Sequence, residues 1–193
     1  MLLLLAALAS LVQDAVPSRA PDYGDLYARG VTYAAFVEQV RVREAEWRRN
    51  TESAAVPEEL ARRVAALPAD RRLLVVAVAS CSDSVSTIPY LAKLAAASGG
   101  HVDIRIVDGD AGRAVMEAHR TPDGRAATPT IAVLDAGGRL VGAWSERPSA
   151  LQTWYLEQKP HLSSRELASQ KAAWYARDAG RSTIEEVVRL LER

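Results

Sequence analysis

The sequence contains a single cysteine, Cys81, among its 193 residues. One thiol excludes an intramolecular disulfide and any zinc site built from several thiolates. The three histidines, His101, His119 and His161, are scattered without the spacing of a ligand set. A glycine-rich phosphate loop is also absent. The sequence therefore predicts neither a bound metal ion nor another cofactor.

An excess of charge of either sign is also lacking. Lys and Arg number 24, as do Asp and Glu, so the formal net charge is zero. This balance gives no electrostatic reason to expect nucleic acid or an anionic membrane surface as a partner. With 49% hydrophobic and 25% charged residues, the composition is typical of a folded domain with a substantial core.

The sequence has one long hydrophobic run, at its N-terminus. Residues 2–12 are apolar except for Ser10, a length that suits a secretory signal and is too short to span a bilayer. No Lys or Arg precedes the run, and no strong cleavage site follows it. The run favours export to the periplasm over a cytoplasmic location; a short helix packed on the domain, or a misplaced start codon, is the alternative. We assign residues 1–27 to a signal peptide with a flexible segment, and 28–193 to one domain.

Apolar spacing along the chain predicts alternating helices and strands. A loop is expected at 17–24, and helical periodicity predicts one helix over 32–49 and another over 57–67. The Val-rich run at 73–79 predicts a strand that is buried on both faces. The remaining predicted elements are helices at 84–97, 111–118, 149–158, 163–179 and 183–191, and strands at 101–107, 130–134 and 139–144. This order indicates an α/β fold of three layers.

Cys81 lies in a turn of small polar residues before the predicted helix at 84–97. Ser82 or Asp83 is placed to cap that helix. A cysteine at a helix N-terminus is close to backbone N–H groups that stabilise the thiolate, which is the form that attacks disulfides. We therefore predict an accessible reactive thiol, and the alternative is an inert core cysteine.

A series of residues that starts at Cys81 resembles the thioredoxin superfamily. Pro89 follows the cysteine inside the predicted helix, Thr128 and Pro129 open a predicted strand, and Gly137 lies in the hairpin turn after it. The order and spacing of these residues are similar to those of thioredoxin. The resemblance implies a thioredoxin-like fold with a central mixed sheet.

The flanking segments resemble a narrower group. The residues at 142–148 and 173–186 are similar to those of bacterial thioredoxin-family proteins in which extra N- and C-terminal helices wrap the core. The resemblance covers residues 28–193, with the thioredoxin core at about 70–146. It implies the fold more strongly than the function.

Thioredoxins carry a second cysteine three residues after the first, which resolves the mixed disulfide. Ser84 occupies that position, so the motif is Cys-x-x-Ser. Its hydroxyl can hydrogen-bond a thiolate but cannot resolve a mixed disulfide. Asp83 adds a negative charge beside the sulfur of Cys81, which opposes thiolate formation.

The resemblance also implies a substrate groove beside the thiol. Thr128 and Pro129 would offer backbone contacts to an extended substrate, as the cis-proline loop does in relatives. Arg120 and Arg125, which precede this loop, are interpreted as exposed loop charges, with binding of an anionic group as the alternative.

Monothiol chemistry is the leading functional hypothesis. Cys81 would attack a disulfide, with Ser84 supporting the thiolate, and an external thiol such as glutathione would resolve the intermediate. The partner would be a protein with a thiol or disulfide, or a small thiol. The substrate would contact four residues around the thiol: Ser82, Asp83, Thr128 and Pro129. The alternative is a redox-inactive thioredoxin-fold module for binding or scaffolding.

Overall fold

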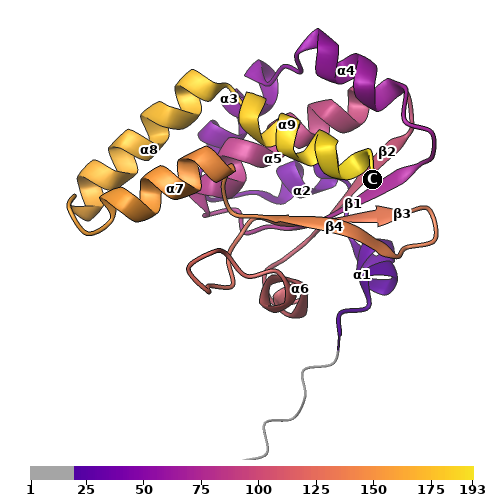
Figure 1. Ribbon diagram of the computed structural model, residues 1–193, viewed down its shortest axis with the longest axis horizontal. Helices are drawn as coiled ribbons and strands as arrows, with labels where there is room; N and C mark the ends of the chain where they lie inside the picture. The colour runs from indigo at the N-terminus through magenta and orange to yellow at the C-terminus, as the bar shows by residue number, and fades with distance from the viewer. Residues whose placement is uncertain (1–19) are drawn as a thin grey trace, which may run out of the picture.

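A computed structural model describes residues 20–193 (Figure 1). The apolar run with the predicted signal peptide lies outside the described residues, so that assignment stays a prediction. The elements are, in order, α1 Tyr23–Arg29, α2 Tyr33–Gln39, α3 Glu44–Ser53, α4 Glu58–Ala65, β1 Arg71–Val76, α5 Ser82–Ala97, β2 Val102–Val107, α6 Arg113–Ala118, β3 Thr130–Asp135, β4 Leu140–Ser145, α7 Ser149–Gln158, α8 Ser164–Asp178 and α9 Arg181–Leu191.

Within the described residues, the strands form one mixed sheet in the order β2-β1-β3-β4. β1 pairs parallel to β2, and β3 pairs antiparallel to both β1 and β4. A parallel pair needs a long crossover between its strands, and α5 supplies it. The predicted α/β fold with a mixed central sheet is confirmed.

Both faces of the sheet are covered by helices, which accounts for the continuous apolar run in β1. Successive side chains of a strand point to opposite faces. Leu73 and Val75 enter a large core with residues of α3, α4, α5 and α9, whereas Leu74 and Val76 enter a smaller core with residues of α1 and α6. Figure 1 shows α1 and α6 on one side of the sheet and the other helices on the opposite side.

The single helix predicted over 32–49 is wrong, because the structure divides it into α2 and α3. Helix α2 ends where Val40 takes an extended conformation, and Arg43, the N-cap residue of α3, has a φ of 59° in the left-handed region. The apolar periodicity continues on both sides of this break, so spacing alone does not reveal it. Thr32 caps α2, since its hydroxyl accepts from the backbone N–H of Ala35.

Helix α1 lies partly in the segment 17–24 that was expected to be a loop. Asp22 begins this helix, because its carboxylate accepts a hydrogen bond from the backbone N–H of Asp25. Leu26 then enters the smaller core. The helical segment that precedes β1 therefore begins earlier in the sequence than the apolar periodicity indicates.

The connection between β1 and α5 also differs from the prediction. β1 ends at Val76 rather than at Ala79, and α5 already begins at Ser82. Cys81 is the N-cap residue, so the prediction that Ser82 or Asp83 caps the helix is wrong. The thiol thus lies at the junction of the turn and the helix.

The C-terminal helices form two units. α7 and α8 pack against each other and extend from the body, whereas α9 returns to pack on α4, α5 and β4 (Figure 1). Gly180 permits this return: its φ is 75°, and a Cβ at this position would lie 2.2 Å from Cγ of Tyr90. No helix between residues 20 and 193 combines the length and apolar character needed to cross a membrane.

Candidate functional site

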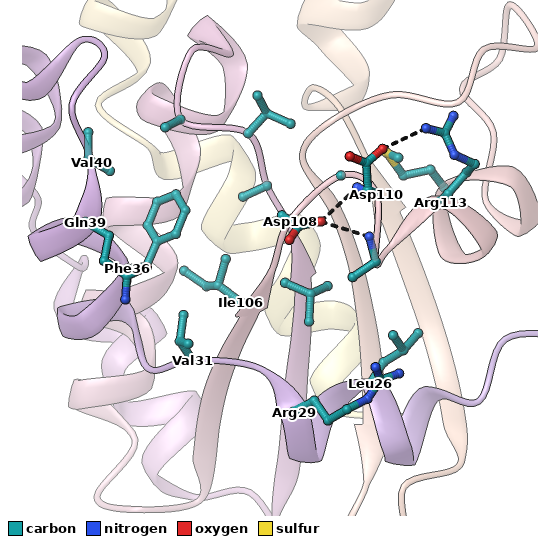
Figure 2. Close-up of a pocket in the computed structure, with 17 residues that line it drawn as sticks. Leu26, Arg29, Val31, Phe36, Gln39, Val40, Ile106, Asp108, Asp110 and Arg113 are labelled. Atoms are coloured by element: carbon teal, nitrogen blue, oxygen red, sulfur yellow. Dashed lines mark hydrogen bonds and ion pairs between the residues drawn. The ribbon is translucent and has the colours of Figure 1, made fainter.

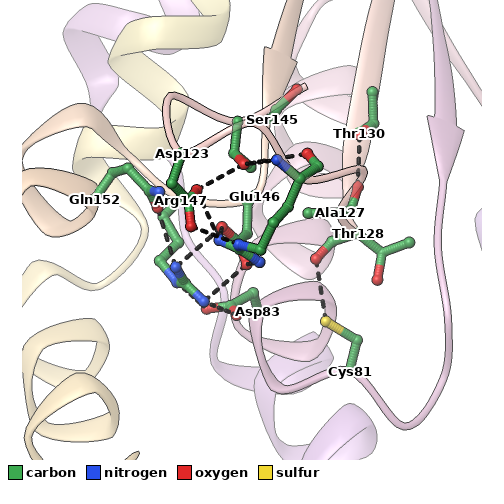
Figure 3. A network of polar contacts seen from close by, with 12 residues as sticks. Cys81, Asp83, Asp123, Ala127, Thr128, Thr130, Ser145, Glu146, Arg147 and Gln152 are labelled. Carbon is green, nitrogen blue, oxygen red and sulfur yellow. Dashed lines mark hydrogen bonds and ion pairs between the residues drawn. The ribbon is translucent and has the colours of Figure 1, made fainter. Parts of the chain in front are cut away.

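Cys81 faces the loop that precedes β3. Its side chain is half-buried, and its Sγ donates a hydrogen bond of 3.2 Å to the carbonyl oxygen of Thr128 (Figure 3). The peptide bond between Thr128 and Pro129 is cis. The fold thus brings the thiol and this loop together, although they lie far apart in the sequence.

Helix α3 holds the segments on both sides of Cys81. The fully buried Trp47 donates its indole N–H to the carbonyl oxygen of Ala79, at 2.9 Å. Asn50 donates its side-chain amide to the carbonyl oxygen of Val85, at 2.8 Å. These bonds satisfy one backbone acceptor in the turn before Cys81 and one in the first turn of α5, so a helix outside the predicted core fixes the position of the thiol.

Ser84 is fully buried, and its hydroxyl has no hydrogen-bond partner within the described residues. Residues three apart on a helix lie on the same face, so Ser84 follows Cys81 along one side of α5. An unsatisfied buried hydroxyl costs about 1–3 kcal/mol. The hydroxyl is therefore available to donate a hydrogen bond to a charged sulfur of Cys81, although no hydrogen bond joins the two side chains in this structure.

Asp83 is buried in an ion network and does not stand alone beside the sulfur. Its carboxylate accepts from Arg147 at 3.1 and 3.2 Å, from Lys171 at 2.8 Å and from the hydroxyl of Tyr175 at 2.8 Å. Lys171 also donates to the hydroxyl of Ser82, at 2.9 Å. The predicted effect of an isolated negative charge is corrected, because two cations neutralise this carboxylate.

The network continues from Arg147 toward the surface (Figure 3). Arg147 is buried, lies 2.8 Å from the carboxylate of Glu146, and donates to the side-chain oxygen of Gln152 at 3.0 Å. Its guanidinium lies over the ring of Tyr155, 3.8 Å from the centroid, a cation–π contact. The residues from the β4–α7 turn and from α7 are thereby tied to the first turn of α5.

Arg125 forms the outer part of the network. It donates to buried Glu146 at 2.7 Å and to Asp123 at 2.6 Å, so this loop charge is paired, although its side chain is 40% exposed. The hydrogen bond from Arg125 lowers the pKa of Asp123 to about 2. Arg120 is also a paired loop charge, because its side chain is half exposed and contacts Glu117.

Tyr175 belongs to the buried inner part of the network. Burial raises its pKa well above the usual value, and the negative charge of Asp83 raises it further. Sequence reasoning missed Tyr175, Lys171 and Arg147 as members of this cluster. Their signal is weak, because each lies in a helix or turn where an exposed polar residue is equally expected.

A cavity of about 760 Å³ lies on the other side of the turn at residues 77–79 (Figure 2). It opens at the carboxyl ends of β1 and β2, and its walls include Phe36 and Ile106. Asp108 at its rim accepts hydrogen bonds from two backbone N–H groups of the following turn. Among the residues that the structure describes, no three His, Cys, Asp or Glu side chains gather as a metal site.

The comparisons with known proteins agree with this fold. A sequence-family profile described as thioredoxin matches residues 30–165. A crystal structure of a protein of unknown function, PA1234 from Pseudomonas aeruginosa, is similar with a TM-score of 0.69, at 24% identity, covering 89% of this chain and 98% of that one. An HIV epitope scaffold is similar with a TM-score of 0.67, at 22% identity and the same coverages.

Such low identities to solved structures establish the fold alone, and no curated protein matches the sequence. The profile match, in contrast, spans more than half of the chain and includes the thiol, the Thr128–Pro129 loop and all of the sheet. The chain therefore belongs to the thioredoxin family.

Proposed function

We propose that the protein exchanges thiols and disulfides through Cys81 alone. The observation that carries this proposal is the position of Sγ: half-buried, at the N-cap of α5, and facing the loop of Thr128 and Pro129. Backbone N–H groups of the first helical turn favour negative charge at such a position. The thiol is the one cysteine of the sequence, so the chemistry must be that of a monothiol.

In the proposed reaction Cys81 first releases its proton to solvent and loses its hydrogen bond to Thr128. The thiolate attacks one sulfur of a disulfide, a bond forms between the two sulfurs, and the second substrate sulfur leaves as a thiolate. An external thiol such as glutathione then attacks the mixed disulfide. This second exchange returns the Cys81 thiolate and joins the external thiol to the substrate sulfur.

The neighbouring residues have distinct roles in this proposal. Thr128 and Pro129 offer a backbone edge to an extended substrate. Ser84 donates its unpartnered hydroxyl to the thiolate. The oxygens of Asp83 are already engaged, so we assign this carboxylate to holding the first turn of α5 rather than to contacting the substrate directly.

The proposal is tested by trapping the mixed disulfide. The full chain is incubated with oxidised glutathione and examined by mass spectrometry, and its alkylation by iodoacetamide is timed in the folded and the urea-unfolded state. We expect one glutathione per chain and faster alkylation of the folded protein. Cys81→Ser is the control and should show neither reaction.

The opposite result favours the alternative function. If the folded thiol reacts more slowly than the unfolded one and no mixed disulfide forms, nothing in the fold activates Cys81. The protein would then be a redox-inactive thioredoxin-fold module, in which the added helices bind a partner.

A further inference from the structure

Helix α5, which follows Cys81 directly, contains a buried proline, Pro89. In an α-helix the N–H of each residue donates to the carbonyl oxygen four residues earlier. Proline has no N–H, so Pro89 leaves the carbonyl oxygen of Val85 without its usual donor. Val85 is only 1% exposed, and a buried carbonyl oxygen needs a donor from elsewhere in the protein.

Asn50 of helix α3 supplies that donor. Its side-chain amide donates to the carbonyl oxygen of Val85, at 2.8 Å. α3 packs against α5, and Trp47 enters the same core as Val85. Residues three apart lie on the same face of a helix, so the packing of Trp47 also directs Asn50 toward α5. The amide therefore takes the place of the hydrogen bond that the backbone of α5 lacks.

Val85 is also bonded to the residue that carries the thiol. Its backbone N–H donates to the carbonyl oxygen of Cys81 at 3.1 Å, which closes the first turn of α5. The N–H groups of this turn favour negative charge on a sulfur at the N-cap. Their direction depends on the conformation of the turn. Through Val85, Asn50 therefore acts on the groups that activate Cys81.

The first turn of α5 needs an anchor outside its own helix. A proline removes a hydrogen bond between the turn before it and its own turn, and it is a usual point of bending. Bending at Pro89 displaces the part of α5 that begins at Cys81. Two bonds from α3 oppose this movement, one from Asn50 and one from Trp47 to the carbonyl oxygen of Ala79. They hold the chain on both sides of the thiol.

We propose that Asn50 is a positioning residue for the exchange reaction of Cys81, because it donates to Val85 the hydrogen bond that Pro89 cannot. This inference rests on the proposed function and adds a determinant of its rate. The determinant comes from a helix outside the predicted core. Asn50 acts through the first turn of α5, so its effect is on how strongly that turn favours the thiolate.

Removal of the donor is the first test. Asn50→Ala keeps a good helix former in α3 but has no amide. Alkylation of Cys81 by iodoacetamide at neutral pH should be slower by about 5-fold, the factor that corresponds to one typical hydrogen bond. The pH at which alkylation reaches half of its maximal rate should rise, because a less ordered turn favours the thiolate less. Asn50→Leu, which has a similar volume and no donor, should show the same change and replaces the alanine variant if that variant does not fold.

Pro89→Ala provides the sharper test. It restores a backbone N–H that can donate to the carbonyl oxygen of Val85. If Asn50 stands in for that N–H, then Asn50→Ala in the Pro89→Ala background should slow alkylation by less than about 2-fold, since residues that share a partner are not additive. Equal slowing in both backgrounds, or no slowing in either, would overturn the proposal.

Thr51→Val is the matched control. Thr51 is the next residue of α3, and its hydroxyl bonds to the carbonyl oxygen of Trp47 and to the hydroxyl of Tyr33. The substitution removes these hydrogen bonds but leaves the amide of Asn50 on α5. Alkylation and its pH profile should therefore match those of the unsubstituted protein. If Thr51→Val is slowed as much as Asn50→Ala, the general stability of α3 sets the reactivity and the donor does not.

Failure of this inference and failure of the exchange reaction give different results. If Asn50 has no positioning role, the mixed disulfide with oxidised glutathione forms at the same rate in Asn50→Ala. If the exchange is wrong, neither protein forms a mixed disulfide, but urea denaturation still shows that Asn50→Ala destabilises the protein less in the Pro89→Ala background. In that case the hydrogen bond to Val85 stands and its role in exchange is refuted.

Discussion

The two sides of the first turn of α5 are built differently. On one side, the half-buried thiol of Cys81 makes one hydrogen bond, to the carbonyl oxygen of Thr128. On the other side, the buried carboxylate of Asp83 accepts hydrogen bonds from three side chains: Arg147, Lys171 and Tyr175. Two residues of the same turn thus have opposite surroundings.

This contrast assigns the reaction to Cys81 and the structural support of the turn to Asp83. A thiol that exchanges must release its partner and meet a substrate, so one breakable hydrogen bond suits it. The carboxylate instead joins α5 to α8 and to the β4–α7 turn, and its partners come from the C-terminal part of the chain. Helix α8 therefore helps to fix the turn that presents Cys81, because it supplies Lys171 and Tyr175 to the network.

The largest effect that tests this contrast is expected from Asp83→Asn. The substitution keeps the shape of the side chain but leaves Lys171 buried without its anion, and Arg147 with Glu146 alone. Removing one partner of a buried ion pair costs about 3–5 kcal/mol. We expect a loss of this size in the free energy of unfolding, measured by urea denaturation, and a weaker attachment of α8.

An exposed carboxylate provides the control for this prediction. Asp110 pairs with Arg113, and their side chains are 94% and 68% exposed. Asp110→Asn should change the free energy of unfolding by less than about 1 kcal/mol. If the two substitutions cost the same, the buried network does not contribute more than a surface pair, and the distinction between the two sides of the turn fails.

A smaller effect of opposite sign is expected from Ser84→Ala. Because the buried hydroxyl lacks a partner, its removal should stabilise the fold by up to about 1 kcal/mol. In the proposed reaction the same change slows mixed-disulfide formation severalfold, because the thiolate loses a donor. Urea denaturation and the rate of reaction with oxidised glutathione measure the two effects separately.

Thr87 offers the matched comparison in the same helix. It is also fully buried, but its hydroxyl donates to the carbonyl oxygen of Asp83 at 2.7 Å. Thr87→Val keeps the shape and removes that bond, so it should destabilise the protein by about 1 kcal/mol. A loss of stability in Ser84→Ala as large as in Thr87→Val would show that Ser84 is bonded in solution and is not free to serve the sulfur.

The fold was predictable because the sequence patterns that indicate it are local. The apolar run in β1 indicates a strand buried on both faces, and the residues from Cys81 to Pro129 follow the thioredoxin spacing. The break between α2 and α3 was not predictable, because the extended Val40 and the left-handed Arg43 leave the helical apolar period on both sides intact. The helix α1 was missed because its apolar content is small and it is only seven residues long.

The ion network shows the limit of local reasoning more clearly. Asp83 was recognised as an acid near the thiol, but its partners Arg147 and Lys171 are 64 and 88 residues away in the sequence. Nothing in the spacing of charges indicates that these three groups converge. Their pairing weakens the inference drawn from Asp83 alone, since a neutralised carboxylate opposes a thiolate less than an isolated one.

The smallest effect is expected at the exposed end of the network, where Asp123 meets Arg125. The pKa of Asp123 in the folded protein is about 2, against an ordinary value of 3.8, chiefly because Arg125 hydrogen-bonds its charged form. A lowered folded-state pKa stabilises the protein above the ordinary value, and this contribution is lost as the pH falls toward 2. Asp123→Asn should therefore destabilise the protein at pH 5 by less than about 1 kcal/mol, because solvent screens the pair. Urea denaturation of both proteins between pH 5 and pH 2 should show this difference shrinking, whereas a constant difference would mean that Asp123 acts through its shape and not through its charge.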